Sequence, residues 1–364
     1  MAAGLYEFTA RSEPNFPLAD IAGEIEEEIN SMEGLKFDSS EVDFMAKMPW
    51  FREDYIEWLA DSKIRPKRQV EVEPQRDGSI RIEVAGNWHE TILYEVPILA
   101  IVEEIYCAKA SGLSPDQAEH KALSRLPEKI ALLNPHPRLT FTDFGTRRRY
   151  SARNHKAVLA YLKDNCSNLV GTSNVWLAKK LGLKAIGTVA HEWFMAHMSL
   201  VDRLEEAQKR ALHVWLQEYG ENLGTALTDT FGTSAFWRDF DPVLARAFSG
   251  VRHDSGNPFQ FGFTAIEQYK KMGIDPRTKT IVFSDSLDFP KMVALFETFT
   301  GTIGVSFGIG TNLMNDVGFN PLSIVMKLMS LNGRPLVKIS DVAGKIMGSC
   351  EMVEKVCAAY KIYA

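Results

Sequence analysis

The sequence predicts an α/β fold in which an irregular TIM-like barrel packs against a smaller N-terminal α/β domain. After residue 138, short apolar runs alternate with helical stretches, and each run ends in a polar or glycine-rich motif. Alternation of this kind predicts strand–helix units and a parallel sheet. Close to eight units fit into roughly 190 residues, which is short for a barrel but suits an irregular one. Before residue 138 the pattern differs, and the proline-rich segment Leu133-Asn-Pro-His-Pro137 separates the two regions.

Residues 1–138 are predicted to form the N-terminal α/β domain. Helical patterns with acidic faces cover residues 24–32 and 40–60. Two runs of alternating residues, 69–73 and 79–85, flank Arg76-Asp-Gly78, which is typical of a β-hairpin. The apolar stretch 97–110 predicts a strongly apolar helix.

Residues 139–340 are predicted to form the barrel and to carry the active site. Strands are expected at residues 139–144, 168–170, 185–190, 225–228, 250–251, 280–283, 304–307 and 323–326. In a parallel barrel the C-terminal ends of all strands lie at one mouth, where barrel enzymes place their chemistry. The motifs that follow the strands are therefore expected to converge there. Residues 341–364 are expected to form a helical extension.

Composition and charge exclude several classes of protein. A formal net charge of −6, from 41 basic and 47 acidic residues, gives no support for nucleic-acid binding. No apolar stretch approaches the roughly 18 residues of a membrane span, and the first residues lack the pattern of a signal peptide. The four cysteines form no Cys-x-x-Cys pair. This argues against structural zinc and a disulfide framework, and it favours a reducing, cytoplasmic location.

His191 is the most informative single residue. The apolar run 185–190 ends at this histidine, so we expect the side chain at the C-terminal edge of a buried strand. The adjacent Glu192 invites a zinc-protease interpretation, which requires a second histidine four residues after the first. That position is Met195, and His197 falls on another helical face. A structural histidine, hydrogen-bonded at a strand end, is the remaining alternative to a catalytic one.

The other strand ends carry residues suited to a phosphorylated sugar, which weakens the structural alternative for His191. The segment Gly308-Ile-Gly-Thr-Asn312 offers unobstructed backbone N–H groups near the seventh strand, where barrels often hold phosphate. Arginine forks match carboxylate and phosphate oxygens, while acidic side chains can hold ribose hydroxyls or Mg²⁺. The candidates are Arg147, Arg148, Arg149, Arg252, Asp254, Asp285 and Asp288. The alternatives are a solvated helix start for the arginines and a helix cap for each aspartate, above all Asp285.

Seven motifs together resemble those of the nicotinate phosphoribosyltransferase family. They are Phe144-Gly-Thr-Arg-Arg-Arg149, Gly171-Thr-Ser-Asn174, Gly187-Thr-Val-Ala-His-Glu-Trp193, Arg252-His-Asp-Ser-Gly256, Phe283-Ser-Asp-Ser-Leu-Asp288, Phe307-Gly-Ile-Gly-Thr311 and Leu331-Asn-Gly-Arg-Pro-Leu-Val-Lys-Ile-Ser-Asp341. They follow the family's order and spacing. The resemblance runs from about Phe8 to near the C-terminus.

The resemblance implies an irregular barrel on a smaller α/β domain, and a homodimer in which the neighbouring subunit completes each active site. It implies that nicotinate reacts with phosphoribosyl pyrophosphate to give nicotinate mononucleotide and pyrophosphate, a step of NAD biosynthesis. It further implies ATP as a co-substrate and Mg²⁺ as a cofactor. By motif match, His191 is the residue that ATP phosphorylates. Phosphorylation would add negative charge to the site and could reorganise nearby basic groups and Mg²⁺.

The resemblance also implies roles for individual residues. Arg252 and Asp254 are expected to act with His191 in catalysis, and Asp254 and Asp285 to hold the ribose hydroxyls. Phe144 is expected to stack on the pyridine ring. The remaining expected contacts are Arg147, Arg148 or Arg252 with the nicotinate carboxylate, Gly308, Gly310 and Thr311 with the 5′-phosphate, Thr172 and Ser173 with substrate, and Asp285 and Asp288 with Mg²⁺.

Two positions depart from the family pattern. The family usually begins with Asp-x-Tyr-x-Leu-x-Met, whose tyrosine helps to enclose nicotinate in the site of the adjacent subunit. Here Tyr6-Glu-Phe-Thr-Ala-Arg11 aligns with the strand after that segment. We therefore expect a shortened N-terminus, in which the aromatic lid is missing or Tyr6 replaces it. Asn257 stands where the family often has aspartate, which would weaken one acidic contact.

These departures leave two alternatives to the family reaction. One is a catalytically impaired homologue that acts as a dimerisation or regulatory partner. The other is a nicotinamide phosphoribosyltransferase, although an amide substrate would not need a carboxylate-binding arginine.

Overall fold

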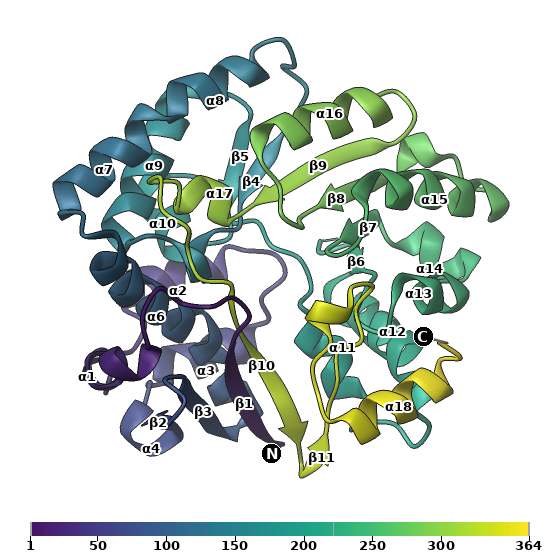
Figure 1. Cartoon of the computed structure of the whole chain (residues 1–364). Coiled ribbons are helices and arrows are strands. Elements are labelled where there is room, and N and C mark those ends of the chain that lie inside the picture. Colours follow the sequence, from purple (N-terminus) through teal and green to yellow (C-terminus); the bar gives the residue numbers. More distant parts are fainter. Residues whose placement is uncertain (1, 221, 363–364) are drawn as a thin grey trace.

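Two sheets organise the molecule, a computed structural model that describes residues 2–220 and 222–362 (Figure 1). The five-stranded sheet is antiparallel, with the order β11-β10-β1-β3-β2. The six-stranded sheet is parallel, with the order β5-β4-β9-β8-β7-β6. The two sheets confirm the predicted α/β class. Residues 1, 363 and 364, at the ends of the expected N-terminal domain and C-terminal extension, lie outside the described residues.

The strands are β1 (Ala3–Ala10), β2 (Val70–Pro74), β3 (Ile80–Asn87), β4 (Phe141–Asp143), β5 (Leu169–Thr172), β6 (Thr225–Leu227), β7 (Gly250–His253), β8 (Thr280–Phe283), β9 (Gly304–Ile309), β10 (Ile324–Leu331) and β11 (Arg334–Pro335). The α-helices are α1 (Ala22–Ser31), α2 (Ser39–Ala46), α3 (Glu53–Asp61), α4 (Pro66–Gln69), α5 (Trp88–Thr91), α6 (Glu95–Ser111), α7 (Pro115–Ser124), α8 (Leu126–Leu133), α9 (Ala152–Asn165), α10 (Val175–Leu181), α11 (His191–His197), α12 (Ala207–Tyr219), α13 (Thr233–Asp239), α14 (Pro242–Ala247), α15 (Pro258–Lys271), α16 (Phe289–Phe299), α17 (Thr311–Met314) and α18 (Cys350–Ala359). None of the helices in the described part of the chain has the length and apolar character needed to cross a membrane.

The N-terminal domain is built around β1, which pairs with β3 on one side and β10 on the other. The expected hairpin is confirmed as β2 and β3. In its turn, the Asp77 carboxylate accepts a hydrogen bond from the Ser79 backbone, and Gly78 has a φ of 86°, which glycine tolerates without strain. The expected apolar helix is confirmed as α6, which packs against α1 and β10.

The helical pattern over residues 40–60 forms two helices, α2 and α3, rather than one. A capping box between Asp38 and Glu41 starts α2. Pro49 lies between the helices; it has no backbone N–H, and its ring disfavours a helical backbone at Met48. The proline therefore ends the first helix, although the apolar periodicity continues.

Pairing between β9 and β4 joins the strands into one parallel, barrel-like sheet, whose edge strands β5 and β6 do not pair with each other within the described residues. β4 lies between β5 and β9, with Phe141 opposite Phe307, and β6 to β9 pair in chain order. Helices α14, α15 and α16 lie outside the strands (Figure 1). The C-terminal ends of the strands therefore share one mouth, as expected.

The prediction of a strand at residues 185–190 is wrong. Only Ala185 forms a parallel bridge, to Thr172 at the end of β5, and the backbone then continues without strand pairing to Ala190. Within the described residues β6, the next strand, pairs with β7 alone, so this run has no second neighbour. Gly187 weakens any strand further. His191 is consequently the first residue of α11.

The prediction that residues from Ser323 onward form the eighth barrel strand is also wrong. These residues form β10, which pairs with β1 in the antiparallel sheet (Figure 1). Because β9 already pairs with both β8 and β4, the barrel leaves no edge beside β9 for another strand. β10 instead contacts α6 and α11 and links the two domains.

The expected helical extension contains the turn η6 (Ala343–Lys345) and helix α18. The Ser349 side chain caps α18 by accepting a hydrogen bond from Met352 N. Tyr360 stacks on Phe231 with a centroid distance of 4.8 Å, and its hydroxyl accepts a hydrogen bond from Gln208 N at 3.1 Å. These contacts dock the extension on the barrel.

Replacing Gly250 by alanine is expected to destabilise the barrel. A Cβ at this position would lie 1.9 Å from the carbonyl oxygen of Thr280 on β8, so the backbone of β7 must move. We expect the free energy of unfolding, measured by urea denaturation, to fall by about 1–3 kcal/mol, as at other overpacked sites.

Gly23→Ala is the matched control, because a Cβ at Gly23 meets no atom within 4 Å and alanine favours helix α1. Its free energy of unfolding should be unchanged or higher than that of the wild type. Equal stability of Gly250→Ala and the wild type would contradict the described pairing of β7 with β8.

Candidate active site

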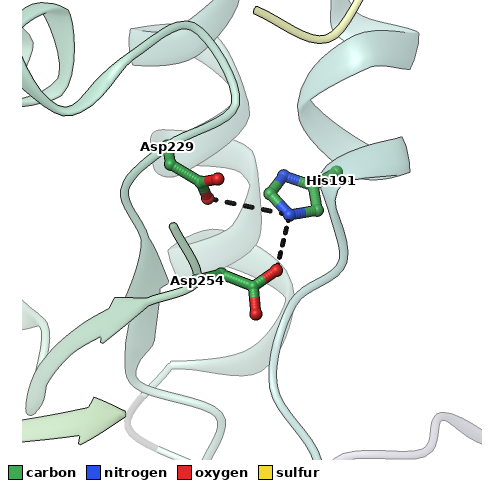
Figure 2. A group of neighbouring side chains, drawn as sticks. All are labelled: His191, Asp229 and Asp254. Atoms are coloured by element: carbon green, nitrogen blue, oxygen red, sulfur yellow. Dashed lines mark hydrogen bonds and ion pairs between the residues drawn. The ribbon is translucent and has the colours of Figure 1, made fainter. Parts of the chain in front are cut away.

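His191 lies between two carboxylates at the mouth of the barrel (Figure 2). Its Nε2 is 2.9 Å from Asp254 Oδ2 and 3.6 Å from Asp229 Oδ1, and its Nδ1 is 3.1 Å from the Thr230 hydroxyl. Asp254 directly follows β7, while Asp229 and Thr230 follow β6. Two neighbouring strands therefore place the partners of the histidine at their C-terminal ends.

The hydrogen bonds of His191 indicate which ring nitrogen carries the proton. An ionised carboxylate only accepts hydrogen bonds, so Nε2 donates to Asp254. Nδ1 then holds the lone pair and accepts from the Thr230 hydroxyl. Burial lowers the pKa of His191 to about 4, against the opposing effect of the Asp229 carboxylate. The imidazole is therefore neutral at neutral pH, with Nδ1 as its nucleophilic nitrogen.

Two cations keep the carboxylates around His191 ionised. Burial alone would raise the pKa of Asp254, but the Arg252 charge and the hydrogen bond from His191 hold this pKa well below its usual range. Burial would also raise the pKa of Asp229, which neighbouring His191 and Lys338 lower instead. Lys338 Nζ lies 3.2 Å from Asp229 Oδ2, and burial lowers the pKa of this lysine.

Arg252 is held by three side chains and one aromatic ring. It donates from Nη1 to Thr188 Oγ1 at 2.9 Å, from Nε to Ser284 Oγ at 2.8 Å and from Nη2 to Asp254 Oδ1 at 2.9 Å. The guanidinium carbon lies 5.7 Å from the centre of the Phe144 ring, within the range of a cation–π contact. The remaining N–H groups of this fixed guanidinium can pair with a substrate carboxylate.

Gly308 makes room for the Phe144 ring. A Cβ at Gly308 would lie 2.3 Å from Phe144 Cδ2, so no other residue fits there without displacing the aromatic ring. The absence of a side chain at Gly308, which was expected to favour phosphate binding, is therefore explained by the space that the Phe144 ring needs. Gly310 and Thr311 follow β9, and Thr311 begins α17.

A cavity of about 220 Å³ lies inside the barrel, next to Phe144 and Thr188. Thr142, Val282, Ser306 and Phe307 also line it. An apolar cavity of roughly 150 Å³ is enough to hold a benzene molecule. The barrel interior therefore has space for a small aromatic ring beside Phe144 and Thr188, and the Thr188 hydroxyl accepts a hydrogen bond from Arg252.

A second group of cations consists of Arg11, after β1, and Arg147 and Arg148 in η3 (Thr146–Arg148). Burial, together with the nearby Arg147 charge, lowers the pKa of Arg11 and lowers that of Arg148 to about 10. Arg147 donates to Glu95 at 3.3 Å. Among the described residues, the Arg11 and Arg148 guanidinium groups have no hydrogen-bond partner. Crowded guanidinium groups of this kind suit an anionic ligand.

Thr172 supports the loop that carries Phe144. Its side chain is fully buried and donates to Asp143 Oδ2 at 2.6 Å. The same carboxylate is 2.7 Å from His155 Nε2 and accepts from Gly145 N at 2.7 Å. The substrate contact predicted for Thr172 is therefore not supported. Ser173, its neighbour, is exposed.

Asp285 and Asp288 do not meet. Asp285 follows β8 and pairs with Lys345 Nζ at 2.6 Å, and the same ammonium donates to the Asp254 carbonyl at 2.9 Å. Asp288 is exposed and caps α16 by accepting from Lys291 N at 2.8 Å. The helix cap, considered above all for Asp285, is thus formed by Asp288.

One group of possible metal ligands is present among the described residues, and it consists of His191, Asp229 and Asp254. Their ligand atoms lie within 4.8 Å of one another. Asp229 Oδ1 is buried without a hydrogen-bond partner, which suits a bound cation. Because Mg²⁺ prefers oxygen ligands, the carboxylates of Asp229 and Asp254 fit it better than the pair predicted from the sequence, Asp285 and Asp288.

Several residues of the site were not predicted as functional, among them four charged ones, namely Arg11, Asp229, Lys338 and Lys345. A signal existed for two of them, because Asp229 follows a predicted strand and Lys338 belongs to the seventh motif. Arg11 comes from the N-terminal domain and Lys345 from the C-terminal extension. No local pattern could place these two beside the barrel.

Tyr6 and Asn257 mark the two departures from the family pattern, and neither has the expected role in the site. Tyr6 is fully buried and donates to Glu192 Oε1 at 2.7 Å, so it cannot enclose a ligand in a neighbouring subunit. Asn257 caps α15 by accepting from Phe259 N at 3.0 Å and Gln260 N at 3.1 Å. Aspartate would fill the same capping role.

The fold and the site together define a class of protein. A barrel mouth with a neutral histidine, flanking carboxylates and fixed guanidinium groups, above a ring-sized cavity inside the barrel, is the site of an enzyme that acts on anionic, phosphorylated substrates.

Comparisons with known proteins specify the family. Residues 139–364 match the nicotinate phosphoribosyltransferase (NAPRTase) family, and residues 2–103 match its N-terminal domain. The nicotinate phosphoribosyltransferase of Photorhabdus laumondii is 42% identical, over 95% of this chain and 87% of its own. The crystal structure of nicotinate phosphoribosyltransferase from Vibrio cholerae has a TM-score of 0.92 and 36% identity, and the match covers 100% of this chain and 89% of that one. The chain belongs to the nicotinate phosphoribosyltransferase family.

His191 is expected to stay neutral down to about pH 4, whereas the ordinary pKa of histidine is 6.5. Because the unfolded chain takes up this proton at the higher pH, the native state loses stability as the pH falls from 6.5 to about 4. The ¹⁵N chemical shifts of the ring, assigned by comparison with His191→Asn, report the midpoint of protonation. A midpoint near the ordinary value would contradict the described burial.

Proposed function

We propose that this chain transfers a phosphoribosyl group from phosphoribosyl pyrophosphate to nicotinate. The pyridine nitrogen attacks ribose C1, the bond from C1 to the pyrophosphate oxygen breaks, and nicotinate mononucleotide and pyrophosphate form. The observation that carries this proposal is the fixed Arg252 guanidinium, which contacts Phe144 and Thr188, two residues that line a ring-sized cavity inside the barrel. A carboxylate on the ring would pair with that guanidinium, whereas the amide of nicotinamide carries no charge to do so.

His191 is proposed to couple this transfer to ATP hydrolysis. Its Nδ1 lone pair attacks the γ-phosphorus of ATP, the bond to the bridging oxygen breaks, and ADP leaves. The positive charge that develops on the ring is stabilised by the Asp254 carboxylate, which accepts a hydrogen bond from Nε2–H. Water later hydrolyses the phosphohistidine and releases phosphate. While it lasts, the phosphoryl group adds negative charge close to Lys338 and Arg252, which would change the affinity for the anionic substrates.

The cations of the site are proposed to bind the phosphates. Arg11, Arg147 and Arg148 would hold pyrophosphate, because their guanidinium groups are crowded and two of them lack partners among the described residues. Gly310 and Thr311 would hold the 5′-phosphate, and Asp285 a ribose hydroxyl. Mg²⁺ is proposed as the cofactor, with Asp229 and Asp254 as its ligands. When bound, this ion would neutralise negative charge on the phosphates.

A homodimer with shared active sites and a cytoplasmic location are proposed on the strength of the family and the cysteine usage. The dimer has a specific consequence here. Tyr6 is buried, so any aromatic residue that encloses nicotinate must come from another segment of the chain or of its partner.

The purified chain is expected to form product from nicotinate, but not from nicotinamide or quinolinate, and ATP is expected to raise the turnover. Each substrate is incubated with phosphoribosyl pyrophosphate, with and without ATP, and the mononucleotides are separated by chromatography. Preference for nicotinamide would overturn the assignment of Arg252. A lack of product from all three substrates would favour the impaired homologue.

In the same experiment, [γ-³²P]ATP is expected to label the wild type and not His191→Asn. Asparagine keeps a polar side chain of similar size but has no nucleophilic ring nitrogen. Labelling of His191→Asn at the wild-type level would contradict the proposal that His191 is phosphorylated. It would leave the proposal of phosphoribosyl transfer unaffected.

Asp254→Asn is expected to slow the labelling of His191 on the order of 10²-fold or more, which is the usual contribution of a positioned acid–base partner. An asparagine amide can donate as well as accept, so it no longer specifies the Nε2–H tautomer. The rate is measured by rapid quench with [γ-³²P]ATP. The control is Asp275→Asn, an exposed aspartate that caps the turn η5 (Pro276–Thr278), and it should label within about twofold of the wild type. Equal rates for both variants would contradict the tautomer assignment.

A further inference from the structure

Glu192, the second half of the His-Glu pair, has no part in the reaction described above but is almost completely buried. Its Oε1 accepts two hydrogen bonds of 2.7 Å, one from the Tyr6 hydroxyl and one from Trp88 Nε1. Tyr6 lies on β1 and Trp88 begins α5, so both donors belong to the N-terminal domain. The residue adjacent to the reactive histidine is thus tied to the other domain.

Apart from the two hydrogen bonds of the His191 ring, the start of α11 has few polar contacts that hold it. The helix spans only His191–His197, and its N-cap residue, Ala190, offers no side-chain hydrogen bond. The preceding run makes one strand bridge, six residues upstream at Ala185. Further along the helix, Trp193 Nε1 donates to the Ala211 carbonyl on α12 at 2.9 Å. That contact fixes the body of α11, whereas Glu192 fixes its first turn.

Glu192 lies near a second group of charged residues of the active site. Burial, and next the Glu95 carboxylate, raise the pKa of Glu192 to about 7. Glu95 in turn accepts from Lys327 on β10 at 3.1 Å and from Arg147 at 3.3 Å. The Glu192 carboxylate is therefore within electrostatic reach of the ion pairs that hold Arg147, although no hydrogen bond among the described residues joins Glu192 to Glu95.

We propose that Glu192 is a positioning residue, which holds the first turn of α11 on Tyr6 and Trp88 so that the His191 ring meets Asp254 and Thr230. His191 is buried against groups of the barrel, and a small rotation of this turn would remove both of its hydrogen bonds. The role rests on the proposed phosphorylation of His191 for its effect on rate, but the position of the ring can be measured independently of any activity.

The test compares Glu192→Ala with Glu192→Gln. Glutamine keeps a carbonyl oxygen that accepts from Tyr6 and Trp88, whereas alanine removes the acceptor and leaves both donors unpaired. We expect Glu192→Ala to slow labelling of His191 by [γ-³²P]ATP about 10- to 100-fold, the range found when partners that orient a functional histidine are removed. Glu192→Gln should restore labelling to within about threefold of the wild type.

A second pair of variants keeps the test valid if Glu192→Ala fails to fold. Tyr6→Phe removes one hydrogen bond to Glu192 and should slow labelling about fivefold. Tyr94→Phe is the matched control: Tyr94 is another buried tyrosine of the same domain, and its hydroxyl bonds Gln69 and Arg65 rather than Glu192. It should lose a similar amount of stability and label at the wild-type rate.

The ring ¹⁵N shifts of His191 provide a readout that a merely structural role would not move. Tyr6→Phe and Glu192→Ala should shift these resonances away from the Nε2–H pattern, while Glu192→Gln and Tyr94→Phe leave them in place. These shifts are informative even if ATP does not phosphorylate the chain, so the two proposals can fail separately. Equal labelling and equal shifts in Tyr6→Phe and Tyr94→Phe, or equal losses in Glu192→Ala and Glu192→Gln, would overturn the positioning role.

Discussion

The pairing of β9 with β4 is the contact on which the rest of the molecule depends. It joins β4 and β5 to the other four parallel strands, so the residues that follow all of these strands face one mouth. The same pairing occupies the second side of β9, and β10 completes the antiparallel sheet beside β1 instead. There Lys327 reaches Glu95, which also accepts from Arg147. One strand pairing thus decides which side chains meet at the mouth and how the two domains are joined.

Burying charged side chains at this site costs free energy, and the pairing of opposite charges offsets that cost. Asp229 and Asp254 are held away from bulk water, where an unpaired charge would cost several kcal/mol. Lys338 and Arg252 compensate these carboxylates, and His191 completes the set as a neutral ring. The ring nitrogen that faces the carboxylates carries the proton, so the other nitrogen is left as a nucleophile. The pairing that makes buried charge tolerable therefore also specifies the reactive atom.

The sequence predicted those parts of the fold that local patterns specify. The hairpin at Asp77-Gly78, the helix α6 and the polar ends of β4 and β6 to β9 all follow from residue type and spacing. The predictions failed at residues 185–190 and 323–326, where an apolar run correctly indicated burial. Such a run does not say which strand it will pair with, since pairing depends on free edges elsewhere in the sheet. Gly308 shows a similar limit, because its need for space comes from Phe144, which is far away in the chain.

The sequence by itself determined the family, through seven motifs in a specific order, and it placed Arg252 and Asp254 at the end of a strand. Order and spacing are local properties, which any chain with these motifs retains. Only the tertiary structure decided that Nδ1 of His191 is the unprotonated ring nitrogen, that Asp229 and Lys338 accompany the ring, and that Glu192 is anchored by Tyr6 and Trp88. The physical reason is that hydrogen bonds and ion pairs join atoms within about 3 Å. Tyr6 and Glu192 are 186 residues apart, and no pattern along the chain records their meeting.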